Sequence, residues 1–293
     1  MKIPLSFTHL VALTGLLFTA ALSSQATAAT LLRLPPSACN ASALYTDGFE
    51  TPISGAPSLP SNGFGGAFPG EQTRTVFVAP LGLRTYHIRL PPEYTPARAY
   101  PMLFVLHGQP PGPSFSDEYA RGVRASWAAV ADAQGFIVVA PVATGPSSGS
   151  WNPPNDDAML DAIRADMELF YNVERTRRYL WGFSAGGHYG HGYALDRANT
   201  LAAYAVNAGV LEGYAGANAP ALASRPLPVS IRVGSADSPG LLAAARRDPP
   251  RFSSSGWVNA DTLRYTEFPG GHTYAAADLQ AAWGFVCGFG VAP

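Results

Sequence analysis

The sequence predicts an α/β protein: a mostly parallel, doubly wound β-sheet with helices packed on both of its faces. Continuous apolar runs, such as residues 101–106, are typical of strands that are buried on both faces. They alternate with segments whose apolar residues have helical spacing, and this alternation implies parallel strands joined by right-handed crossovers. The chain has 293 residues, of which 47% are hydrophobic, so it can bury the core that such a sheet requires.

The first 28 residues are predicted to be a signal peptide. Lys2 is followed by an apolar run over residues 10–22, and the small residues after it end at Ala28 in an A-x-A cleavage site. The run is too short, and its exit too polar, for a membrane anchor, and no later segment is apolar enough to span a bilayer. We therefore expect an exported protein, secreted or periplasmic, without stable membrane insertion.

Residues 29–72 are rich in Pro, Gly and Ser and have few periodic apolar positions. This composition predicts a linker or a loosely docked N-terminal arm, so the folded domain is expected over residues 73–293. The two cysteines are Cys39, in the arm, and Cys287, near the C-terminus. In an oxidising compartment they are candidates for one disulfide; the alternative is a buried thiol at Cys287 and an unpaired one at Cys39.

The secondary structure of the domain is expected in the following order. Alternating residues at 73–78 and 84–90 predict two antiparallel strands joined around Pro80 to Gly82. Further strands are expected at residues 101–106, 135–140 and 178–181, within 201–210, and at 229–233 and 263–268. Helices are expected at residues 119–134, 156–171, 188–197 and 278–289.

The segment Gly182-Phe183-Ser184-Ala185-Gly186 carries the main functional signal. A G-x-S-x-G between a buried strand and a helix is the nucleophile-elbow pattern, in which a sharp turn holds the serine hydroxyl clear of the sheet. Glycines flank the serine because Cβ atoms there would collide as strand and helix fold back on each other. Ser184 is therefore the predicted nucleophile.

Two further polar residues follow later strands in the order serine, acid, histidine. Asp237 follows the strand at 229–233, and His272 follows the strand at 263–268. Because parallel α/β sheets place their sites at the carboxyl ends of strands, His272 is the expected general base and Asp237 the acid that orients it. Asp248, in a Pro-rich stretch read as a loop, and Asp261, before a strand, are the competing acids.

The sequence also indicates which backbone N–H groups form the oxyanion hole. Ala185 begins the helix after the serine, and Gln109 follows the strand at 101–106, whereas Pro110, Pro111 and Pro113 have no N–H to donate. The backbone N–H groups of Ala185 and Gln109 are therefore the expected donors.

Other side chains near the strand ends carry weaker signals. Trp151 either lines a substrate pocket or covers the core, and the sequence leaves both readings open. His87 and His107 are expected to be structural. His188 and His191 lie three residues apart without a third ligand, so packing is favoured over a metal site.

The motifs together resemble those of a known enzyme group. The matching segments are Leu106-His107-Gly108, Trp151, the elbow, Gly234-Ser235-Ala236-Asp237 and Pro269-Gly270-Gly271-His272. Over about residues 73–290 the chain is similar to secreted α/β-hydrolase serine esterases, the group that contains polyhydroxybutyrate depolymerases, feruloyl esterases and acetyl xylan esterases. The resemblance implies the α/β-hydrolase fold, a Ser184–His272–Asp237 triad and no cofactor.

We therefore expect a serine hydrolase that cleaves carboxylic esters, on a small molecule, a polyester or a plant polysaccharide, through an acyl-enzyme. The alternatives are a serine peptidase of the prolyl-oligopeptidase type and a hydrolase-fold binding protein with a silent triad. The net charge of −1 gives no reason to expect a nucleic-acid partner. Oligomeric state is left open.

Overall fold

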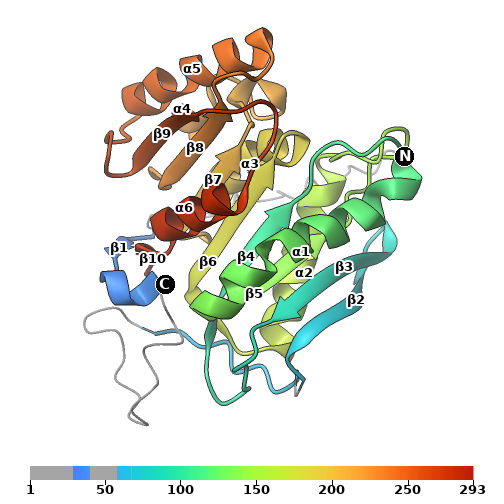
Figure 1. The fold of residues 1–293 in the computed structure, drawn as a ribbon. Helices are drawn as coiled ribbons and strands as arrows, with labels where there is room; N and C mark the ends of the chain where they lie inside the picture. Colours follow the sequence, from blue (N-terminus) through green and yellow to red (C-terminus); the bar gives the residue numbers. More distant parts are fainter. Residues whose placement is uncertain (1–28, 40–57, 67, 293) are drawn as a thin grey trace, which may run out of the picture.

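The computed structural model describes residues 29–39, 58–66 and 68–292. Within these residues, eight strands form one sheet in the order β2-β3-β5-β4-β6-β7-β8-β9 (Figure 1). The strands are β2 (Gly70–Val78), β3 (Gly82–Leu90), β4 (Tyr100–Leu106), β5 (Ile137–Pro141), β6 (Val173–Phe183), β7 (Ala203–Asn207), β8 (Val229–Gly234) and β9 (Leu263–Phe268). Six neighbouring strands of this sheet, β5, β4, β6, β7, β8 and β9, run parallel to one another. Strands β2 and β3 form an antiparallel hairpin at one edge, and β3 also pairs antiparallel with β5.

The helices form a layer on each face of the sheet. They are α1 (Ser116–Gln134), α2 (Asn155–Phe170), α3 (Ala185–Asp196), α4 (Ala219–Leu222), α5 (Pro239–Ser254) and α6 (Ala276–Val286). One apolar cluster packs α1 and α6 against the face that Leu103 and Val105 share, and a second packs α2, α3 and the end of α5 against the opposite face. Both faces of β4 are thus buried, which explains its continuous apolar run.

The segment before the sheet is more ordered than its composition indicated. Strand β1 (Leu31–Arg33), which was not predicted, pairs antiparallel with β10 (Phe289–Val291). Cys39 and Cys287 form a disulfide with their Cα atoms 5.0 Å apart. Pro60 forms an isolated bridge with Glu174 at the start of β6. The described parts of the predicted arm, residues 29–39 and 58–66, therefore pack on the domain; residues 40–57 lie outside the described residues, as does the predicted signal peptide.

Most predicted elements lie within a few residues of their observed positions, and α5 is the main exception. The sequence reading placed Asp248 in a Pro-rich loop, but residues 239–254 form a helix that includes Pro249 and Pro250. Pro239 stands at the first turn, where its missing N–H is not needed. The buried side chains of Leu242 and Phe252 pack the helix onto the sheet, so tertiary burial outweighs the unfavourable helix propensity of proline. No helix in the described part of the chain is long and apolar enough to cross a membrane.

Candidate active site

Ser184 stands on a sharp turn between β6 and α3. Its backbone has φ 51° and ψ −119°, a conformation that a residue with a side chain rarely adopts. A Cβ at Gly182 would collide with the backbone of Gly186, and a Cβ at Gly186 would lie 2.5 Å from the His107 carbonyl oxygen. Both glycines are therefore required by close backbone contact. The Ser184 N–H donates to the Asn207 carbonyl oxygen at the end of β7, 2.9 Å away, which ties the turn to the sheet.

The turns after β8 and β9 bring Asp237 and His272 to this edge of the sheet. The Ser235 N–H donates to the Phe268 carbonyl and the Ala236 N–H to the Gly270 carbonyl, each over 2.8 Å. A Cβ at Gly234 would collide with the backbone of residues 270 and 271, so the two turns are in direct contact. This contact places the two side chains beside each other.

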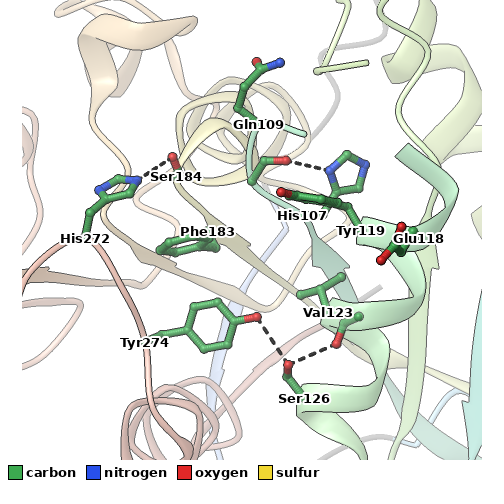
Figure 2. Close-up of a pocket in the computed structure, with 12 residues that line it drawn as sticks. His107, Gln109, Glu118, Tyr119, Val123, Ser126, Phe183, Ser184, His272 and Tyr274 are labelled. Carbon is green, nitrogen blue, oxygen red and sulfur yellow. Dashed lines mark hydrogen bonds between the residues drawn. The ribbon is translucent and has the colours of Figure 1, made fainter. Parts of the chain in front are cut away.

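The Ser184, His272 and Asp237 side chains form one hydrogen-bonded chain. His272 Nε2 lies 2.8 Å from Ser184 Oγ, as Figure 2 shows. His272 Nδ1 lies 2.9 Å from Asp237 Oδ2 and 3.2 Å from Oδ1, and Oδ1 also accepts the Ser238 N–H at 2.6 Å. The Asp237 side chain is 1% exposed and the His272 side chain 42% exposed. A buried carboxylate thus holds the imidazole, whose other nitrogen faces a serine hydroxyl.

The two competing aspartates lie elsewhere. Asp248 is buried in α5, where it accepts the Leu211 N–H and pairs with Arg251. Burial raises the pKa of the Asp248 carboxyl to about 6. Asp261 pairs with Arg33 of β1 and is half exposed. Neither carboxylate contacts His272.

The loop after β4 passes close to Ser184. A Cβ at Gly108 would lie 3.0 Å from the Phe183 ring and 3.4 Å from Ser184 Cβ. The Gln109 side chain points away from the serine (Figure 2). Its amide donates to the Ser148 carbonyl oxygen over 2.8 Å. Among the described residues, the backbone N–H groups of Gln109 and Ala185 have no hydrogen-bond acceptor. Both remain available to an oxygen beside Ser184.

His107 anchors this loop and is not part of the hydrogen-bonded chain. Its Nε2 accepts the Ala143 N–H at 3.3 Å, so its Nδ1 carries the proton and donates to the Gly108 carbonyl oxygen at 2.7 Å. Burial lowers the pKa of His107 to about 4, so the ring is neutral near pH 7. Its structural role agrees with the sequence reading.

A cavity of about 660 Å³ opens beside Ser184 and His272. Phe183, Val123, Tyr119 and Tyr274 give it apolar and aromatic walls, and Glu118 is its only carboxylate (Figure 2). The Phe183 ring lies 5.2 Å from the His272 ring and 4.8 Å from the Tyr274 ring. Phe183 lies within the elbow motif and Tyr274 two residues after the histidine, but neither was predicted to line a pocket.

Trp151 packs in the core and does not line the cavity. It is 3% exposed, its indole N–H donates to the His107 carbonyl oxygen over 2.9 Å, and its ring stacks on Tyr189. Of the two roles that the sequence left open for Trp151, the structure therefore shows core packing and not pocket lining.

The other histidines in the described part of the chain are held by hydrogen bonds. His87 bonds to Thr73 and Asp117, and His191 bonds to the Tyr204 hydroxyl. His188 Nδ1 accepts the Val210 N–H at 2.9 Å. No group of three or more potential metal ligands lies together in the part of the chain that the structure describes.

Known proteins resemble the chain in sequence and in fold, although no family model matches it. It is 28% identical over 232 residues to a bifunctional acetylxylan esterase/xylanase of Neocallimastix patriciarum, covering 69% of this chain and 33% of that protein. It is 31% identical over 183 residues to feruloyl esterase C of Emericella nidulans, covering 60% of this chain and 63% of that protein. The chain thus spans about a third of the first relative and just under two thirds of the second.

Among solved structures, a ferulic acid esterase of Anaeromyces mucronatus in complex with ferulic acid matches with a TM-score of 0.57 and 18% identity. The match covers 82% of this chain and 94% of that one. At this identity the likeness shows the fold alone. The chain has the α/β-hydrolase fold, and the resemblance to α/β-hydrolase esterases that its motifs indicated is confirmed.

Proposed function

We propose that the protein is an exported serine esterase that hydrolyses carboxylic esters attached to plant polysaccharides. The observation that carries the proposal is the Ser184–His272–Asp237 hydrogen-bonded chain at the mouth of an apolar cavity. The similarity to an acetylxylan esterase/xylanase and to a feruloyl esterase supports the substrate class. The disulfide between Cys39 and Cys287 supports export, because such bonds persist in oxidising compartments.

In the proposed first step, Ser184 Oγ attacks the ester carbonyl carbon while His272 Nε2 takes the serine proton. Negative charge moves to the carbonyl oxygen, which the N–H groups of Ala185 and Gln109 stabilise by about 3 kcal/mol per donor. The bond between the former carbonyl carbon and the alcohol oxygen of the sugar then breaks. The departing alcohol oxygen takes the proton from His272. Asp237 holds Nδ1–H throughout and stabilises the imidazolium.

In the second step, water attacks the acyl-enzyme. His272 accepts a proton from the water, and the oxyanion forms in the same place. Collapse of this intermediate returns the proton to Ser184 Oγ and releases the carboxylic acid. His272 thus mediates every proton transfer in the proposed cycle.

The lining and the volume of the cavity favour a substrate with an aromatic acyl group. Its aromatic walls, Tyr119, Phe183 and Tyr274, suit the flat face of an aryl ring. Its volume of about 660 Å³ is within the usual range for a small organic ligand. We therefore propose a hydroxycinnamoyl ester, of which ferulate is the relevant example, over a short acetyl group.

The test compares four substrates: methyl ferulate, p-nitrophenyl acetate, a hydroxyalkanoate polyester and a p-nitroanilide of a dipeptide. The proposal predicts the highest kcat/KM with methyl ferulate and no cleavage of the anilide. A preference for the anilide would indicate a peptidase, and a preference for the polyester a depolymerase. Absence of turnover, with no labelling of Ser184 by a fluorophosphonate, would indicate a silent hydrolase fold.

A further inference from the structure

A second cavity, of about 320 Å³, lies beside the first and has no role in the proposed reaction. Its lining includes residues of the loop after β5 and the first residues of α1 and α2, Ser116 and Asn155. Glu118 and Tyr119, in the same first turn of α1, line the first cavity. Ala143 lines the second cavity, and His107 lines the first. The backbone N–H of Ala143 donates a hydrogen bond to His107 Nε2. Neighbouring residues of α1 and the two partners of one hydrogen bond therefore line the two cavities.

The second cavity carries a positive charge that no described carboxylate neutralises. Arg84 is the only charged residue in its lining. One terminal nitrogen of Arg84 donates to the Leu81 carbonyl oxygen, which fixes the side chain, and Nε is buried without an acceptor. Among the described residues Arg84 forms no ion pair, and Nη1 has no acceptor. In the first cavity, by contrast, the carboxylate of Glu118 disfavours a negatively charged group.

Neutral polar groups surround the guanidinium. Thr85 and Asn155 line the cavity, and within the described residues their side chains have no hydrogen-bond partner. The buried carboxylate of Asp156, next to Asn155 in the chain, forms no ion pair with Arg84 and accepts the N–H groups of Thr144 and Asn152.

These groups fit one kind of ligand. An arginine with a free terminal nitrogen binds a carboxylate by charge-assisted hydrogen bonds. A threonine hydroxyl and an asparagine amide both donate and accept, as sugar hydroxyl groups require. Pro113 and Val142 give the cavity apolar wall for the C–H face of a sugar ring. We infer that this cavity binds a uronic-acid unit of the polysaccharide that bears the ester, so that the protein favours esters on acidic chains. This inference rests on the proposed function for the reaction itself.

The kinetic test uses two feruloylated xylo-oligosaccharides that differ only in one glucuronic-acid branch. The wild type is expected to hydrolyse the acidic substrate with the higher kcat/KM. In Arg84→Gln the ratio of the two kcat/KM values falls about tenfold, the loss expected for one hydrogen bond to a charged group. Arg246→Gln removes an exposed arginine from α5 and leaves the ratio unchanged. Equal rates on both substrates in the wild type, or an unchanged ratio in Arg84→Gln, would overturn the inference.

A binding test separates this inference from the proposed function. Calorimetric titration with a glucuronic-acid-bearing xylo-oligosaccharide that has no ester is expected to give binding to the wild type. Arg84→Gln and Thr85→Val should weaken that binding, and the matched neutral oligosaccharide should bind more weakly than the acidic one. Loss of esterase activity with retained binding would refute only the proposed reaction. Equal competition by acetate or sulfate would show a general anion site and refute the assignment to a uronic acid.

Discussion

The substitution Asp237→Asn tests the identity of the acid most sharply. Asp237 Oδ1 accepts the Ser238 N–H at 2.6 Å, so the carbonyl oxygen of an asparagine stays there. The amide NH₂ then occupies the place of Oδ2, 2.9 Å from His272 Nδ1. Because two donors cannot face each other, Nδ1 gives up its proton and Nε2 carries it. Nε2–H cannot accept the proton of Ser184, so the productive tautomer is lost.

The expected loss follows from that change of tautomer. In serine-hydrolase triads the same substitution lowers kcat about 10⁴-fold, which corresponds to about 5.5 kcal/mol of transition-state stabilisation. Asp248→Asn is the matched control, because it neutralises another buried aspartate without contacting His272. The assay is kcat/KM for p-nitrophenyl acetate, with thermal unfolding to show that both variants are folded. Activity of Asp237→Asn within tenfold of wild type, or an equal loss in Asp248→Asn, would refute the reasoning.

Three further predictions concern stability and the elbow. The double substitution of Cys39 and Cys287 by serine should lower the free energy of unfolding, measured in urea, by about 5 kcal/mol, because the disulfide closes a loop of 248 residues. A loss below about 1 kcal/mol would contradict a role of this disulfide in constraining the unfolded chain. Gly186→Ala should lower kcat/KM at least about 100-fold, because the Cβ of the alanine would displace the backbone around Ser184. Gly284→Ala, on α6, is the control: a Cβ there has open space, and the variant should retain wild-type activity. Burial raises the pKa of Asp248 from 3.8 to about 6 on folding, so the stability that this carboxyl contributes is largest below pH 4 and is lost as the pH rises through 6. Relative to Asp248→Asn, which does not titrate, the free energy of unfolding of the wild type should fall by about 2.4 kcal/mol between pH 4 and pH 7 in denaturant unfolding, and a constant difference would contradict this expectation.

The parts of the site that local chain chemistry dictates were predictable from the sequence. The elbow requires glycines at fixed positions around Ser184, and the structure shows the backbone contacts that require them. Asp237 and His272 each follow one of two neighbouring parallel strands, β8 and β9, and parallel strands end at the same edge of a sheet. Their contact with each other and with Ser184 therefore follows from topology.

The parts that were missed depend on tertiary contacts. Strand β1 is short and gains its pairing only from β10, at the other end of the chain. Helix α5 contains two prolines in its interior, Pro249 and Pro250, and burial of its apolar side chains keeps it helical. Trp151 follows a strand end as a pocket residue would, but the direction of a loop side chain is set by its partners, here His107 and Tyr189. The second cavity joins residues from four separate segments, so no local pattern indicated it.

The central claim is that Ser184 is the nucleophile of an esterase. The most direct measurement is hydrolysis of p-nitrophenyl acetate, butyrate and octanoate by the wild-type protein and by Ser184→Ala, with circular dichroism to show that both are folded. If Ser184 is the nucleophile, the wild type hydrolyses these esters and the Ser184→Ala variant gives only the uncatalysed rate. A folded Ser184→Ala variant that retains turnover, or a folded wild type that hydrolyses none of the esters, would contradict it.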